Sequence, residues 1–236
     1  MALPKLTTPT YELEIPSTDE KIKYRPFLVK EEKILMMAME SKENADITQA
    51  VKDIVSECTF NKVKIDDMPM FDVEYIFLQI RSKSVGEVSK LKLLCPDDEE
   101  TYTQTEINLD EIDVQMTEGH TNETQLTDTI KLVMKYPQLA DMRGVQMKGD
   151  SQISQVFSIL KHCIWEVHDG ETIYNRVDIS DKDIEDFVDS FDTGQFEKVM
   201  EFFNTMPKLR HSVEITNPKT KVKSMVTIEG LESFLG

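Results

Sequence analysis

Three cysteines and four histidines are the residues of this chain best suited to nucleophilic or metal chemistry. A cysteine nucleophile needs a base within hydrogen-bond reach, and His162 directly precedes Cys163 in the sequence. Both residues fall in a predicted helix, where adjacent side chains point in different directions. A catalytic pair would need a distant histidine, such as His211, to be brought close by the fold. We therefore predict no catalytic residue and expect the chain not to be an enzyme.

Cys95 raises the question of a zinc site. It lies in LKLLCPDDEETYTQTEINL, which has the shape of one half of a zinc ribbon, and HSVEITNPKTKVKSMVTIEGL has the shape of the other half. A structural zinc ion needs about four thiolate or imidazole ligands, usually in close pairs. The first segment supplies one cysteine and the second supplies none. We predict no bound metal, with the hypothesis that both segments descend from a metal-binding ancestor that lost its ligands.

An acidic stretch near the end of the chain suggests calcium binding. It lacks the alternating oxygen ligands, central glycine and distal glutamate of an EF-hand loop, so a solvated helix surface is favoured. The sequence contains neither GxxxxGKS/T nor GxGxxG, and nothing singles out two carboxylates as acid and base. No cofactor is predicted. The acidic residues concerned are Asp178, Asp181, Asp183, Glu185, Asp186, Asp189 and Asp192.

A formal net charge of −17 limits the partners of this chain. Phosphate backbones and anionic membrane surfaces repel such a chain, so nucleic acid is not expected as a partner. No apolar run approaches the roughly 20 residues that span a bilayer, and the first residues lack the features of a signal peptide. Cys58, Cys95 and Cys163 are odd in number and widely spaced, which favours reduced thiols. Together these features predict a cytoplasmic protein.

The first part of the chain predicts a β-hairpin followed by helices. Residues 11–15 and 21–27 alternate on either side of the turn PSTDE, and Pro26 ends the second strand because it has no N–H to donate. Apolar residues then recur at helical spacing. The predicted helices begin at Val29 and end before residues 41–44, and then cover residues 46–58 and 70–81. Pro69 suits the start of the third helix and Gly86 its end.

The rest of the chain predicts strands followed by helices. LKLLC, PDDEE and TYTQTEINL are typical of a strand, a turn and a second strand. Gly144 and Gly149 lie in a polar stretch that we interpret as a linker. Further strands are predicted at residues 112–117 and 125–134, helices at 153–165, 180–190 and 193–204, and a closing hairpin in HSVEIT, NPKTK and VKSMVTIEG.

These elements predict an α+β fold in three sections, which could also form one compact unit. Residues 1–88 would form a hairpin plus a helical assembly module, and residues 89–148 a β-rich middle section with hairpins. Residues 149–236 would form helices that close with a β-hairpin.

The predicted helices also carry candidate partner-binding residues. The chain has 13 methionines, whose flexible side chains suit adaptable binding surfaces. FDVEYIFLQI has the pattern of a helical core and equally of a groove for an apolar segment of a partner. The sequence leaves open whether each residue is core or contact. The candidates are Met36, Met39, Phe71, Tyr75, Phe77 and Leu78.

The order of these features resembles the T4-type bacteriophage baseplate hub and hub-assembly proteins. The resemblance rests on YRPFLVKEEKILMMAMES, a helix ending near ECTF, IDDMPMFDVEYIFLQIRSKSVGE, LKLLCPDD and the final VTIEGLESFLG. Its most specific part is residues 69–87. The front half is also similar to tail assembly chaperones.

This resemblance implies a hub component or hub-assembly chaperone that binds other tail proteins during virion assembly. The implied partners are phage tail and baseplate hub proteins, with the tape-measure protein as one candidate. The implied location is the host cytoplasm, with the virion tail baseplate as a second. A permanent structural baseplate subunit and a cytoplasmic enzyme with a dispersed site remain as alternatives, and self-association is left open.

Overall fold

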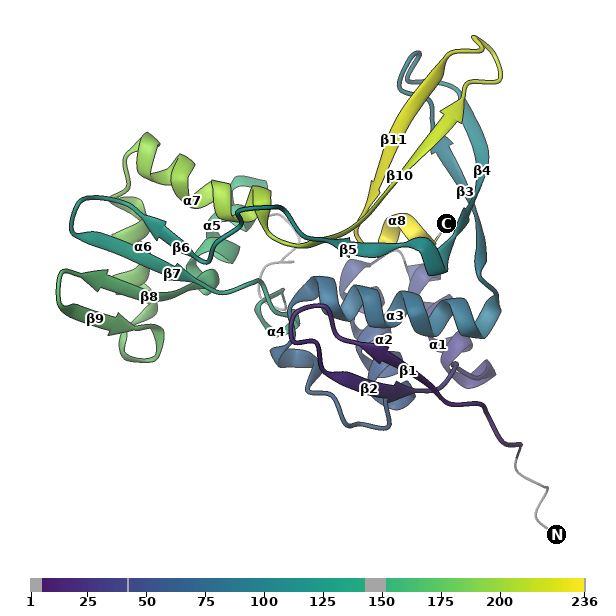
Figure 1. The fold of residues 1–236 in the computed structure, drawn as a ribbon, viewed down its shortest axis with the longest axis horizontal. Helices are drawn as coiled ribbons and strands as arrows, with labels where there is room; N and C mark the ends of the chain where they lie inside the picture. The colour runs from purple at the N-terminus through teal and green to yellow at the C-terminus, as the bar shows by residue number, and fades with distance from the viewer. Residues whose placement is uncertain (1–5, 42, 143–151, 236) are drawn as a thin grey trace. The chain divides into compact units, whose positions relative to one another are not determined.

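The computed structural model describes residues 6–41, 43–142 and 152–235 of the 236-residue chain (Figure 1). The fold is α+β, with helices and small antiparallel sheets, as the sequence predicts. The linker expected around Gly144 and Gly149 lies outside the described residues. None of the described helices is long and apolar enough to cross a membrane.

The chain divides into two compact units. Unit 1 comprises residues 1–115 and 208–236, and unit 2 comprises residues 116–207. These bounds differ from the sections 1–88, 89–148 and 149–236 that the order of elements suggests. The difference arises because β10 (Lys208–Thr216) pairs with β5 (Asp113–Gln115), so the last strands of the chain belong to the same sheet as a strand from its middle.

Unit 1 begins with the predicted hairpin and helices. β1 (Tyr11–Glu14) pairs with β2 (Lys21–Tyr24), and the chain then turns at Pro26 into the helices. The third helix is longer than predicted and ends at Gly86, whose φ of 115° is accessible to glycine. The helical elements are α1 (Val29–Ser41), α2 (Asn44–Cys58), the short 3-10 helix η1 (Ile65–Asp67) and α3 (Met70–Val85).

The α3 helix forms the core of unit 1. Val73, Ile76, Phe77 and Ile80, which recur at helical spacing along one face, are all buried. Phe71, Leu78 and Ser82 are buried as well, so this helix is covered on most of its circumference. A helix that is apolar nearly all round is stable only when other elements surround it.

Two long hairpins complete unit 1 (Figure 1). β3 (Val88–Leu94) pairs with β4 (Tyr102–Asn108), and β10 pairs with β11 (Lys223–Glu229), as the sequence predicts. The predicted strand at residues 112–117 is β5, which extends the second hairpin into a three-stranded sheet. The 3-10 helix η2 (Leu109–Glu111) and the helix α8 (Glu232–Leu235) flank these strands.

Unit 2 is a four-stranded sheet with helices packed on it. The strand order is β6 (Glu123–Gln125), β7 (Ile130–Met134), β8 (Ile164–Asp169) and β9 (Thr172–Asn175). Its core includes Leu132, Leu160, Ile184, Val199 and Phe202. The helical elements are α4 (Leu139–Met142), α5 (Gln152–Cys163), η3 (Arg176–Asp178), α6 (Asp181–Asp189) and α7 (Thr193–Thr205).

One predicted helix boundary in unit 2 is wrong. We expected a helix over residues 153–165 followed by a break, but α5 ends at Cys163 and β8 begins at Ile164. Ile164 and Trp165 continue the apolar pattern of the helix, yet β-branched and aromatic residues also favour strands, and here pairing with β7 decides. The segment HDGETIYN therefore contains the end of β8, the two-residue turn and β9.

The helix starts of unit 2 follow capping rules. The Ser180 hydroxyl accepts a hydrogen bond from the Asp183 N–H at the start of α6, as its sequence position predicts. Asp192 and Gln195 form a reciprocal capping box at the start of α7, which sequence analysis did not identify.

A buried carboxylate joins the first hairpin of unit 1 to α3. Asp72 is fully buried and accepts hydrogen bonds from the Ser17 N–H, at 3.1 Å, and from the Ser17 hydroxyl. Burial raises the pKa of Asp72 from 3.8 to about 6, because it disfavours the charged form by more than the Ser17 hydrogen bonds favour it. The contact therefore titrates in a range where most carboxylates are ionised.

Replacement of Asp72 by asparagine should remove one component of the pH dependence of stability. Between pH 3.8 and about 6 the folded state retains a proton that the unfolded state has lost, so Asp72 lowers stability as the pH rises through this window. The wild type should lose up to about 3 kcal/mol relative to Asp72→Asn between pH 4 and 7. Urea unfolding of both proteins at several pH values measures this difference.

Asp19→Asn is the matched control, because it removes a carboxylate from the exposed end of the same turn. Asn also tolerates the φ of 56° at this position. Parallel stability curves for wild type and Asp72→Asn would contradict the prediction.

Candidate partner-binding surface

The α1 helix presents apolar residues on two opposite faces. Its inner face buries Glu31, Leu35 and Ala38 and packs against α2, where Val51, Ile54 and Val55 are buried. Its outer face carries Val29, Met36 and Met37, and these side chains are 80%, 59% and 60% exposed. The inner face explains why the helix folds onto unit 1, whereas the outer face requires another explanation.

The exposed residues form one stripe along α1. At 100° per residue, Val29 and Met36 lie within about 20° of each other, and Met37 extends the stripe to one side. Lys33 lies between them on the same face and is exposed. Apolar side chains at i, i+7 and i+8 are the spacing with which an amphipathic helix contacts a partner. Single exposed apolar residues are common, but three strongly exposed ones on one side of a helix, here around Lys33, mark a candidate interaction site.

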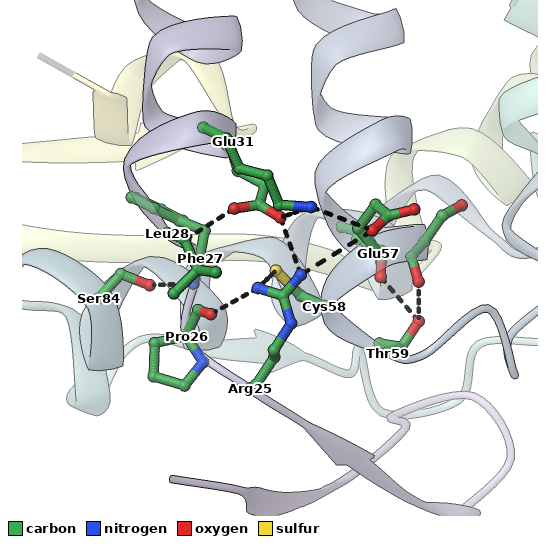
Figure 2. Close-up of polar contacts among 12 residues, drawn as sticks. Arg25, Pro26, Phe27, Leu28, Glu31, Glu57, Cys58, Thr59 and Ser84 are labelled. Carbon is green, nitrogen blue, oxygen red and sulfur yellow. Dashed lines mark hydrogen bonds and ion pairs between the residues drawn. The ribbon is translucent and has the colours of Figure 1, made fainter. Parts of the chain in front are cut away.

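A buried ion pair fixes the start of α1 (Figure 2). The Arg25 Nη2 lies 2.8 Å from the Glu31 Oε1, and the two side chains are 11% and 2% exposed. Arg25 follows β2, and Glu31 lies in the first turn of α1. The pair therefore sets the angle at which the chain leaves the hairpin and enters the helix.

Glu31 also caps the helix that it belongs to. Its Oε2 accepts a hydrogen bond of 2.8 Å from the backbone N–H of Leu28, the residue before the helix (Figure 2). A glutamate at the third helical position that reaches back in this way forms half of a capping box. Its negative charge also lies near the positive end of the helix dipole. One carboxylate thus satisfies both a buried cation and a free helix N–H.

Arg25 connects this corner to the end of α2. Its backbone N–H donates to the Cys58 carbonyl at 3.0 Å, and its Nη1 donates to the Pro26 carbonyl at 3.0 Å and lies 3.7 Å from the Cys58 sulfur. The Phe27 N–H donates to the Ser84 hydroxyl on α3 at 2.9 Å. The hairpin, α1, α2 and α3 therefore meet at one corner (Figure 2).

The pKa shifts at this corner keep both partners charged. Burial alone would raise the pKa of Glu31, but the hydrogen bonds from Arg25, the Leu28 N–H and Lys30 outweigh it and lower that pKa. Burial would likewise lower the pKa of Arg25, and the Glu31 carboxylate outweighs it and raises that pKa. The stabilisation from Glu31 is therefore present at neutral pH and is lost as the pH falls through its folded-state pKa.

The structure separates the six candidate contact residues into core and surface. Phe71, Phe77 and Leu78 are buried in α3, so they stabilise unit 1 and are not available to a partner. Met39 and Tyr75 are partly buried. Of the six, Met36 lies on the exposed stripe of α1. Sequence analysis missed Val29 and Met37, although their spacing from Met36 could have identified them.

The three cysteines are free thiols, and all are buried. Burial raises the pKa of Cys58 to about 11 and that of Cys163 to about 12, so both stay protonated near neutral pH. His162 is exposed, and its Nδ1 lies 2.8 Å from the Ser158 carbonyl. A neutral, buried thiol is a poor nucleophile, so Cys163 has the character of a core residue.

The two segments compared with a zinc ribbon meet through hydrogen bonds. The Asn217 side-chain amide donates to both carboxylate oxygens of Asp97 at 3.1 Å, and the Thr220 hydroxyl donates to the same carboxylate. Cys95 is buried beside this contact, at the end of β3. Among the residues that the structure describes, no three histidine, cysteine or acidic side chains come together as a metal site would require. Polar side chains thus join the tips of the two hairpins.

Comparison with models of protein families gives a match that covers nearly the whole chain. The family model for T4 bacteriophage base plate protein matches residues 8–236, a range that includes most of unit 1 and all of unit 2. Neither the curated proteins nor the solved structures give a match.

Replacement of Glu31 by glutamine should destabilise the protein strongly. Glutamine can still accept the Leu28 N–H, but it leaves the buried Arg25 with only the exposed, more distant Glu57 carboxylate, at 4.0 Å, as a counter-charge. Loss of one partner from a buried ion pair typically costs about 3–5 kcal/mol. We expect this decrease in the free energy of unfolding, measured by urea denaturation at pH 7.

Glu57→Gln is the control, because Glu57 is exposed and lies 4.0 Å from Arg25. It should cost less than about 1 kcal/mol. The double variant Arg25→Met, Glu31→Gln should be more stable than the sum of the single effects predicts. Additive effects would contradict the role given to the ion pair.

Proposed function

The chain belongs to the family of T4 bacteriophage base plate proteins, and from this membership we propose that it is a baseplate hub component or hub-assembly chaperone. In this role it binds other phage tail proteins while the virion is assembled. Membership itself makes it a baseplate-associated protein. The finer role is supported by the surface of α1.

The exposed stripe of Val29, Met36 and Met37 carries this proposal. Burial of an exposed methionine or valine side chain contributes roughly 1.5–3 kcal/mol, so the three side chains together can anchor a partner. Methionine side chains adapt to different surfaces, which suits a protein that contacts several tail components. The buried Arg25–Glu31 pair holds the helix in place, which reduces the conformational entropy lost on binding.

The charge of the chain supports a role in handling apolar partners. A protein that covers an apolar surface of another protein must keep the complex in solution. The net charge of −17 provides repulsion between complexes. In the proposed role the protein acts in the host cytoplasm and meets hub proteins or the tape-measure protein there, before or during assembly of the baseplate.

We propose that this role involves no bond chemistry. The buried thiols of Cys58 and Cys163 remain protonated near neutral pH, and the acidic residues after position 178 lie mainly on the exposed side of α6. The protein would promote assembly by binding and release of partners.

Substitution of the α1 stripe should abolish partner capture without unfolding the protein. Met36→Gln combined with Met37→Gln keeps the side-chain length and removes the apolar character at two exposed positions. The change in the free energy of unfolding should be below about 1 kcal/mol, because exposed positions contribute little to stability. Affinity capture from infected host cells, followed by mass spectrometry, measures which tail proteins are bound.

Met225→Gln is the matched control, because Met225 is 63% exposed on β11 of the same unit. The wild type and this control should capture hub or tape-measure proteins, and the double variant should lose at least about nine-tenths of them. Equal capture by all three proteins would contradict the assignment of the surface. Capture of no phage tail protein by any of them would contradict the proposed function.

Mass spectrometry of finished virions separates the two forms of the proposal. A protein that is captured with hub components but absent from virions acts as a chaperone. A fixed copy number in virions identifies a permanent structural subunit of the baseplate.

A further inference from the structure

The sheet of unit 2 has one edge that lacks the usual protection against pairing. Among the described residues β9 pairs only with β8, so its other hydrogen-bonding side is unpaired (Figure 1). All four residues of β9 are exposed, and Ile173 and Tyr174 are 53% and 48% exposed. Edge strands usually carry a lysine, a proline or a bulge that prevents pairing with another chain. At four residues β9 is short, which itself limits pairing, but its sequence TIYN contains no lysine or proline and it pairs with β8 without a bulge.

The opposite edge of the same sheet is different. β6 has the sequence ETQ, its Glu123 forms an ion pair with Lys131, and α7 packs against it. Charge and a covering helix are two of the ways in which proteins block an edge. By these criteria β9 is the less protected edge of the sheet.

A groove runs beside β9. It has a volume of about 230 Å³ and lies between the sheet and α6. The groove is lined by Tyr174 of β9 and by Ile130 and Val167 of the neighbouring strands β7 and β8. Ile179, Ile184 and Phe187 line the side formed by η3 and α6. The groove is mainly apolar and is large enough for one or two aliphatic side chains.

The hairpin turn determines which β9 groups face outward. β8 and β9 are joined by Gly170 and Glu171, and Gly170 has a φ of 58°. A glycine with positive φ at the first position of a two-residue loop is typical of a type II′ turn, which closes on a hydrogen-bonded pair, here Asp169 and Thr172. Hydrogen-bonded and non-hydrogen-bonded pairs alternate along antiparallel strands. The N–H and C=O of Ile173 therefore point away from β8.

The charge around the groove specifies the partner. Asp169 and Asp183 line the groove, and both are exposed. Residues 169–192 contain only Arg176 and Lys182 as basic residues, and Arg176 is already paired with Asp181. A second copy of this chain would bring the same negative charges together, which disfavours pairing between two β9 strands. A basic segment would instead be attracted.

We propose that β9 and the adjacent groove bind an extended segment of a partner protein that alternates apolar and basic side chains on one face. The segment would add a strand to β9 through backbone hydrogen bonds to Ile173. Because side chains two residues apart face the same side of a strand, an apolar side chain would enter the groove while a lysine or arginine two residues away meets Asp169 or Asp183. The site lies in unit 2 and does not depend on the α1 surface or on the hub role.

Peptide binding to the full chain tests the site. The probe is the labelled peptide SLTKTLTKS, which places leucine and lysine alternately on one face, and fluorescence anisotropy measures its dissociation constant. The peptide SLTETLTES is the charge control and should bind about tenfold more weakly or not at all. Failure of SLTKTLTKS to bind at millimolar concentration would overturn the proposal.

Two pairs of variants separate the backbone and charge contributions. Ile173→Pro removes the outward N–H, and proline is tolerated at this position of an edge strand. Ile173→Ala keeps the N–H and removes only the apolar side chain. The proline variant should bind SLTKTLTKS about tenfold more weakly than the alanine variant. Equal binding by the two variants would show that β9 adds no strand and would overturn the proposal.

Asp169→Lys tests the charge, since Asp169 forms no ion pair among the described residues. This variant should lose binding to SLTKTLTKS and gain binding to SLTETLTES. If the Asp169→Lys variant still bound SLTKTLTKS more tightly than SLTETLTES, the assignment of a basic partner would be overturned. Sedimentation of the wild type is a further test, because a dimer that Ile173→Pro dissociates would identify a second copy as the occupant and contradict the proposal.

Discussion

The buried ion pair between Arg25 and Glu31 is the interaction on which the arrangement of the first helices depends. Two charges removed from water are tolerated only when each has close partners. Arg25 has the Glu31 carboxylate and the Pro26 carbonyl, and Glu31 has the guanidinium and the Leu28 N–H. These partners come from the end of the hairpin and the start of α1. A rearranged corner would separate the two most buried charges from their closest partners, which favours the observed geometry. Because the ion pair fixes the start of α1, it also fixes the position of the outer face that carries Met36 and Met37.

The two proposed surfaces use different physical means to bind a partner. The α1 stripe offers apolar area on a preformed helix. Its flexible methionine side chains suit binding to several different partners better than recognition of a single one. The β9 edge offers backbone hydrogen bonds and a small groove bordered by carboxylates, which favours a particular pattern of side chains. In the two proposals the α1 stripe holds an assembly component and the β9 edge binds a defined segment of a partner, so the two surfaces would serve different steps of assembly. The hydrogen bonds that join Asp97 to Asn217 and Thr220 have a structural role at the hairpin tips.

Much of the local structure could be predicted from the sequence, because the responsible signals are local. The alternation around PSTDE, the apolar spacing of α2 and α3, Gly86 as a helix end and Ser180 as a helix cap all operate within a few residues. The pairings between distant segments could not be predicted. From the sequence, Glu31 is one of four charged residues in the first turn of α1, and its burial beside Arg25 arises only in the folded chain. Ile164 and Trp165 fit a helix equally well, and the pairing of β8 with β7, which includes Ile164, makes them part of a strand. The exposed stripe of α1 could be predicted only in part, because the sequence analysis names Met36 as a candidate contact residue but not Val29 or Met37.

Hydrogen exchange on α1 tests the central claim most directly. Amide exchange would be measured by mass spectrometry for the purified protein alone and for its complex with a captured tail protein. The account predicts that peptides covering Val29–Ser41 exchange more slowly in the complex, because the partner covers the outer face of a helix that already has its native conformation. Unchanged exchange in α1, with slower exchange only in other parts of the chain, would show that the partner binds elsewhere and would contradict the account.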